Sequence, residues 1–280
     1  MQFPFRPLMN KLSPFVPNYV KHAGYELIDF GQRAFSSVRV EEQPIFVLGN
    51  HKAGTTAVAA LLGELSGLPV SLELKRQIHR PQFDQVYSGQ LPMEVFVNQN
   101  RVAFSRRIIK ENQLLFVVDA LHRRFPEGQF VGIIRDPRDN IRSILNRLDL
   151  PGDGDQSFRA ISVGRGWRHV IDNTWLDIDC ENYIEQLAHR WNRAAEIYLA
   201  NRQRIQLVQY EKFNENKREV LVELAERLGI RHENDITPWL NVQYQPRGNR
   251  SITWPEFFGS HNLKLIETIC SDGMNQFDYK

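Results

Sequence analysis

Short apolar runs alternate with segments of helical periodicity along the first half of the chain. Residues 44–48 form a continuous apolar run ending at Gly49, and apolar residues over 55–65 recur at helical spacing. Similar runs predict strands over 70–74, 114–118 and 130–134, and a helix follows over 140–147. Strands that alternate with helices favour a three-layer α/β fold, a parallel β-sheet flanked by helices.

Polar side chains follow several of these predicted strands. They are Lys52, Glu73, Asp119, His122 and Arg135. Ligands of open parallel sheets bind outside the carboxyl ends of the strands. These five residues are therefore the first candidates for a functional site.

The stretch GNHKAGTT, residues 49–56, joins the first predicted strand to the first predicted helix. Backbone amides of such a loop and the positive end of the helix can surround a phosphate, and Thr55 and Thr56 add hydroxyl donors. Lys52 adds a full charge, but it lies inside the loop rather than after the final glycine as in a Walker-type P-loop. The stretch predicts an anion site.

A second candidate anion site lies in residues 130–145, FVGIIRDPRDNIRSIL. Arg135 ends the predicted strand, and Ser143 follows eight residues later on a helix that can bring its hydroxyl back beside the guanidinium. The alternative is a set of surface ion pairs among the arginines and aspartates of this segment. Two anion sites at neighbouring strand ends would fit a ligand with two separated phosphates.

Composition narrows the class of protein. The 280 residues are 42% hydrophobic, which suits one sizeable core, so we expect a single domain over 44–280. A net charge of +2 gives no global positive field, which argues against a nucleic-acid partner. Cys180 and Cys270 form neither a disulfide framework nor a metal-ligand set, so the prediction is a reducing, cytoplasmic compartment.

Two segments are expected to be irregular. Residues 1–43 contain four early prolines and no apolar run long enough for a membrane span, so they predict an irregular arm packed on the domain. Peripheral contact with a membrane or a partner is the alternative for this arm. Residues 148–167 are rich in glycine and charge and predict a mobile surface loop.

These motifs resemble those of sulfotransferases that use 3′-phosphoadenosine-5′-phosphosulfate (PAPS), which have a P-loop NTPase-like fold. The family's 5′-phosphosulfate loop is similar to Lys52, Ala53, Gly54, Thr55 and Thr56. Its 3′-phosphate segment is similar to Arg135 with Ser143, and its strand ending in Tyr-Glu is similar to residues 206–213, with Tyr210 toward adenine. Residues 247–250, which include Arg247 and Gly248, resemble the late basic loop over the 3′-phosphate.

The resemblance implies transfer of a sulfuryl group from PAPS to a hydroxyl, or an amine, with adenosine 3′,5′-bisphosphate (PAP) as product and no metal. Lys52 would stabilise the leaving phosphate during in-line attack. Glu73 would be the base, as in carbohydrate and protein-tyrosine sulfotransferases, and His122 is the rival. Ala57 departs from the family pattern, in which an aromatic residue often follows the threonines.

The sequence leaves open which acceptor is used and whether the reaction is sulfuryl transfer. The acceptor is a carbohydrate, a lipid or another small molecule, and Trp167, Trp175 and Trp191 either line its pocket or belong to the core. A P-loop nucleotide or small-molecule kinase is an alternative function, although the sequence lacks the usual GK[ST] ending. A third possible function is that of a nucleotide-binding module without catalysis.

Overall fold

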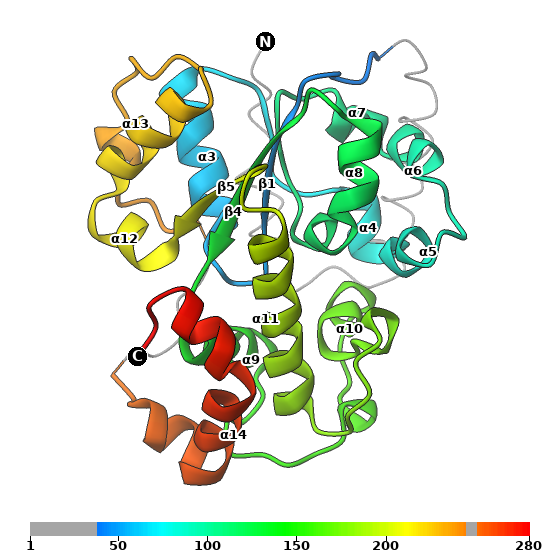
Figure 1. Ribbon diagram of the computed structural model, residues 1–280, viewed down its shortest axis with the longest axis vertical. Helices are drawn as coiled ribbons and strands as arrows, with labels where there is room; N and C mark the ends of the chain where they lie inside the picture. The colour runs from blue at the N-terminus through cyan, green and yellow to red at the C-terminus, as the bar shows by residue number, and fades with distance from the viewer. Residues whose placement is uncertain (1–37, 245–250) are drawn as a thin grey trace, which may run out of the picture. The chain divides into compact units, whose positions relative to one another are not determined.

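The computed structural model describes residues 38–244 and 251–280 (Figure 1). The chain divides into two units, and the architecture below is that of Val40–Lys280. Residues 1–37 of the predicted arm lie outside the described residues, so the arm and the domain boundary stay predictions. At the start of the described unit, the amide of Glu41 donates a hydrogen bond to the carbonyl of Phe104 at 2.8 Å.

The centre of the unit is a parallel sheet of five strands. These are β1 (Ile45–Gly49), β2 (Val70–Ser71), β3 (Ile108–Lys110), β4 (Gln129–Ile134) and β5 (Ile205–Gln209). Their order is β2-β3-β1-β4-β5, and every pairing is parallel. The chain therefore runs first to one side of β1 and then to the other, which is the arrangement that places a ligand site at the strand ends beside β1.

Helices cover both faces of this sheet, so the predicted three-layer α/β fold is confirmed. The helices are α3 (Thr55–Ser66), α4 (Lys75–His79), α5 (Phe83–Tyr87), α6 (Met93–Gln99), α7 (Arg101–Phe104), α8 (Val118–Arg124), α9 (Pro137–Leu148), α10 (Arg165–Ile171), α11 (Tyr183–Ala200), α12 (Tyr210–Glu215), α13 (Lys217–Arg227) and α14 (Trp254–Gln276). Short 3₁₀ turns are η1 (Asn112–Val117), η2 (Phe158–Ala160), η3 (Thr174–Leu176) and η4 (Thr237–Trp239).

Each face of the sheet has its own apolar core because successive side chains of a strand point to opposite faces. Ile45 and Val47 of β1 pack with α3 and α13, whereas Phe46 and Leu48 pack on the other side with residues of α8, α9 and α11. Figure 1 shows α3, α12 and α13 together on one side of the strands and α8 on the other. The central strand β1 is apolar throughout because both of its faces are buried.

The third predicted strand is wrong. Residues 114–118 are buried, as a core strand would be, but they form η1 and the first residue of α8. The strand beside β1 is instead β3, which pairs Ile108 with Ile45. The second predicted strand, 70–74, is shortened to two residues, because Leu74 already precedes α4.

The predicted mobile loop over 148–167 is packed against the unit. Phe158 and Ile161 are buried, and the side-chain amide of Asn262 donates to the carbonyls of Gly152 and Gly154 at 2.9 and 3.0 Å. These contacts hold the glycine-rich stretch to α14.

Candidate functional site

The carboxyl ends of the five strands meet at one edge of the sheet. Close after each end, or at it, comes a charged or aromatic residue: Lys52 after β1, Glu73 after β2, Lys110 at the end of β3, Arg135 after β4 and Tyr210 after β5. Four of these five are sequence-predicted site residues. Three of these side chains, Lys52, Lys110 and Arg135, are cationic and can bind an anion.

The loop between β1 and α3 depends on two glycines. A Cβ on Gly49 would lie 2.6 Å from Cγ2 of Thr55 and 2.9 Å from the carbonyl oxygen of Ile133. Gly54 has φ 100°, and a Cβ there would lie 2.4 Å from the ring of Tyr210. Only glycine permits both close approaches, and the second places the ring of Tyr210 directly against the loop.

Buried amide side chains hold the loop in place. Asn50 donates to Oδ1 of Asn140 at 2.9 Å and accepts from the backbone amide of His51, while Asn140 donates to the carbonyl of His51 at 2.7 Å. The hydroxyl of Thr55 donates to Oδ1 of Asn112 at 2.8 Å. The loop is thereby connected to both α9 and η1. Within the loop, the side chain of Ala53 is buried. Thr56 lies in the first turn of α3.

Arg135 joins the loop to Tyr210. Its guanidinium donates to the carbonyl of Lys52 at 2.9 Å and lies 4.6 Å from the ring centroid of Tyr210. It also lies 3.6 Å from the carboxylate of Asp139. The predicted loop, the predicted second anion segment and the predicted adenine residue are thus neighbours.

Lys52 lies in a positive environment. Its backbone has φ 65°, which is uncommon for a residue with a Cβ. Burial, followed by the charges of Arg147, Arg135 and Lys110, lowers the pKa of Lys52 to about 8. Like charges disfavour protonation of the amine, so an anion placed among them would be held strongly.

Glu73 and Lys110 form an ion pair at the β2–β3 side of this edge. Oε1 of Glu73 lies 3.6 Å from Nζ of Lys110, and the lysine side chain is 3% exposed against 45% for the glutamate. The neighbouring Glu111 is buried and accepts hydrogen bonds from the amides of Leu74 and Gln113. Burial raises the pKa of Glu111, and its two hydrogen bonds tie the backbone after Glu73 to η1.

Arg190 of α11 is fully buried behind the loop. It donates to Asn50 at 2.9 Å, to Gln113 at 2.7 Å, and to Asn173 at 2.6 Å, as well as to the carbonyl of His169 at 3.1 Å. Within residues 38–244 and 251–280, no carboxylate lies within ion-pair distance of it. Burial lowers the pKa of Arg190 to about 9, so the guanidinium is charged at neutral pH.

His51 and one tryptophan adjoin the loop on the α10 side. The His51 ring lies 5.4 Å from the ring of Trp167, and burial, with the charge of Arg190 next, lowers the pKa of His51 well below its usual value. Trp191 is buried and donates to the carbonyl of Arg135, so it belongs to the core, and Trp175 packs on Phe116. Of the three tryptophans, Trp167 faces the loop.

Two predicted residues, Asp119 and His122, are not brought to this edge. Asp119 and His122 lie in α8, and the His122 ring packs 4.1 Å from Phe130, near the amino end of β4. Ser143 lies on α9, and among the described residues it makes no hydrogen bond with Arg135. Arg247 and Gly248 lie outside the described residues.

Sequence reasoning missed Lys110, Arg190 and the buried amides. Lys110 ends the run Ile108-Ile109, which is too short to stand out beside the longer apolar run at 114–118. Arg190 was detectable, because it lies between Leu187 and Ala194 on the apolar face of α11, where a charged side chain is unusual.

Among the described residues, no group of three or more His, Cys, Asp or Glu side chains is placed to hold a metal ion. No helix in the described part of the chain combines the length and apolar character needed to cross a bilayer.

A parallel sheet with a basic loop and a helix start at its carboxyl edge defines a class of α/β proteins whose strand ends suit anionic ligands. Within that class the chain belongs to the sulfotransferase family: the model described as "Sulfotransferase family" matches residues 71–234. This match covers Glu73, Lys110, Arg135, Arg190 and Tyr210 and begins after the loop. A sequence comparison with curated proteins gives no match.

One solved sulfotransferase shares the fold, and two others serve for comparison of sequence and coverage. Sulfotransferase STF1 from Mycobacterium tuberculosis H37Rv is 14% identical, with a TM-score of 0.50 over 84% of this chain and 78% of that chain. STF9 from Mycobacterium avium is 14% identical over 87% of this chain and 79% of that chain, with a TM-score of 0.48. Mouse sulfotransferase SULT7A1, solved in complex with PAP, is 12% identical over 85% of this chain and 87% of that chain, with a TM-score of 0.45.

Proposed function

We propose that the chain transfers the sulfuryl group of PAPS to a hydroxyl on a small acceptor. The observation that carries this proposal is the convergence of Lys52, Lys110 and Arg135 beside the start of α3, with Glu73 paired to Lys110. Membership of the sulfotransferase family supports sulfuryl transfer over phosphoryl transfer or binding without catalysis.

The donor would lie along the loop. Lys52, the amides of the loop and the hydroxyls of Thr55 and Thr56 would hold the 5′-phosphosulfate, and the positive end of α3 would add to the field. Arg135 and Ser143 would hold the 3′-phosphate. Tyr210, which lies against Gly54 and Arg135, would pack on the adenine.

Glu73 would act as the base. It would take the proton from the acceptor hydroxyl as that oxygen attacks sulfur and the bond from sulfur to the bridging oxygen breaks, which releases PAP. Lys52 would stabilise the negative charge that develops on the 5′-phosphate. Lys110 would hold the Glu73 carboxylate in position through their ion pair.

The proposal is tested by binding measurements with EDTA present. The full chain should bind PAP with the same affinity whether or not EDTA is added, because the charge on the nucleotide would be matched by lysine and arginine. A kinase site should instead prefer ATP and lose it on chelation, since Mg²⁺ bridges the phosphates. Calorimetry that shows chelation-sensitive ATP binding and no response to PAP would refute the proposal.

Arg135→Ala should weaken binding of PAP far more than of adenosine 5′-monophosphate. A charge-assisted hydrogen bond contributes roughly 1.5–3 kcal/mol, so the loss of PAP affinity should be about 10- to 150-fold. Arg193→Ala is a control, because Arg193 is an arginine of α11 that, like Arg135, pairs with a nearby carboxylate, here Glu196 at 3.3 Å. Equal losses for both nucleotides in calorimetry would show that Arg135 does not bind the 3′-phosphate.

Binding of PAP to the free protein should also weaken as the pH rises through about 8. Lys52 is protonated below its pKa of about 8 and loses its charge above it. Arg147→Gln removes a neighbouring positive charge, so the midpoint of the decline should move to higher pH. Lys52→Arg should remove the decline, because arginine stays charged to about pH 12. Titrations that give one midpoint for all three proteins would contradict the assignment to Lys52.

A further inference from the structure

A cavity of about 450 Å³ lies between α4 and α10, and its described wall carries Arg76, Arg80, Arg165, Arg168 and His169. The rest of that wall is proline and glutamine, with no acidic side chain. We propose that this cavity, called here the arginine pocket, binds a phosphate or sulfate group that the acceptor already carries. This inference rests on the proposed function and specifies its substrate class.

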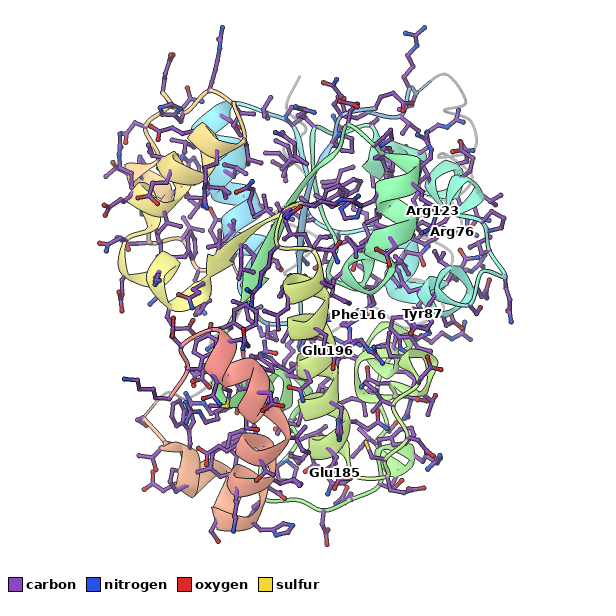
Figure 2. All side chains as sticks on the ribbon, in the orientation of Figure 1. Arg76, Tyr87, Phe116, Arg123, Glu185 and Glu196 are labelled. Carbon is purple, nitrogen blue, oxygen red and sulfur yellow. The ribbon has the colours of Figure 1, made fainter. Side chains whose placement is uncertain are left out.

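The arginine pocket adjoins both sides of the proposed reaction site. Helix α4 connects the pocket to Glu73, because it begins two residues after the glutamate and carries Arg76 of the pocket wall (Figure 2). Toward the loop, Trp167 of α10 lies 5.4 Å from His51. The two helices are themselves packed together, since a Cβ on Gly166 would lie 3.0 Å from the carbonyl oxygen of Ile78.

Two arginines of the pocket, Arg165 and Arg168, have no carboxylate partner among the described residues. Both terminal nitrogens of Arg168 donate to neutral groups, the carbonyls of Phe158 and Ile161. Asp84 and Asp172 act electrostatically on His169. A pocket walled by one sign of charge concentrates ligands of the other sign.

The chemistry of the wall selects the anion. Guanidinium groups match the geometry of phosphate and sulfate oxygens and donate paired hydrogen bonds to them. Nδ1 of His169 has no hydrogen-bond partner among the described residues and adds a further polar contact. Several guanidinium groups around one cavity suit an ester with two or three negative oxygens better than a neutral sugar or a phenol.

The test is calorimetric titration of inorganic pyrophosphate into the full chain, with and without saturating PAP. Pyrophosphate should bind the PAP-saturated protein, because the donor site is then filled and the arginine pocket is left. Arg80→Gln combined with Arg165→Gln, two exposed positions, should weaken this binding about tenfold and leave PAP affinity unchanged. Arg227→Gln, an exposed arginine of α13 on the other face of the sheet, should change neither.

The outcomes separate the two proposals. If PAP binds but pyrophosphate affinity is the same in the wild type and in the double variant, the arginine pocket is not an anion site and the proposed sulfotransfer stands. If pyrophosphate binding falls equally in Arg227→Gln, the effect is one of net charge and the inference fails. If PAP does not bind at all, the proposed function fails, and the contrast between the variants without PAP still decides whether the pocket binds anions.

Discussion

Lys52→Ala is expected to lower the rate of sulfuryl transfer by about 10²–10³-fold. The side chain would stabilise the charge that develops on the leaving phosphate, and deletion of one such group in an active site costs on the order of 3–4 kcal/mol of transition-state stabilisation. The half-buried position of Lys52 strengthens its interaction with that charge relative to one in bulk water. The measurement is transfer of labelled sulfate from the donor to an acceptor found by screening.

Two variants make this result specific. Lys52→Arg should recover part of the rate, because it keeps the charge and alters its geometry. Lys212→Ala should keep the wild-type rate, since Lys212 is an exposed lysine two residues after Tyr210. A Lys52→Ala protein that is folded and transfers sulfate at the wild-type rate would exclude Lys52 from the chemistry.

Glu73→Gln should lower turnover by roughly 10²–10⁴-fold, the usual contribution of a general base, and leave PAP binding nearly intact. The glutamine keeps the shape of the side chain but cannot accept the proton. Turnover is measured with labelled donor, and PAP affinity is measured by calorimetry on the same preparation.

His122→Ala is the comparison for Glu73→Gln. We expect it to retain most of the turnover, because the His122 ring packs on Phe130 near the amino end of β4, at the edge of the sheet away from Lys52. If His122→Ala abolishes turnover and Glu73→Gln does not, the assignment of the base reverses.

The sequence predicted correctly those parts of the fold whose elements follow one another directly in the chain. The run before Gly49, the loop and α3 are continuous in the chain, as are β4, Arg135 and α9. Hydrophobic periodicity and helix-start chemistry suffice for such units. Tyr210, which directly follows β5, was predicted only from the resemblance of residues 206–213 to the family's strand ending in Tyr-Glu.

The parts that failed depend on contacts between distant segments. Residues 114–118 and β3 are both apolar and buried, so periodicity cannot tell which of them is the strand; the pairing of Ile108 with Ile45 decides it. Because a strand was predicted over residues 114–118 instead of at β3, His122 was expected at a strand end and Lys110 was not recognised as a site residue. The contact of Arg190 with Asn50 spans 140 residues and has no local signature.

Arg190, which has no carboxylate partner in the described part of the chain, has a consequence for the stability of the protein. A buried cation whose hydrogen-bond acceptors are all neutral opposes folding, because desolvation of its charge is not offset by an opposite charge. An anionic donor bound to the loop beside Asn50 would act as the missing counter-ion. A ligand at a hundred times its Kd adds about 2.7 kcal/mol to the free energy of unfolding. The donor would then stabilise the folded state as well as serve as a substrate. Its concentration would therefore influence the lifetime of the folded protein.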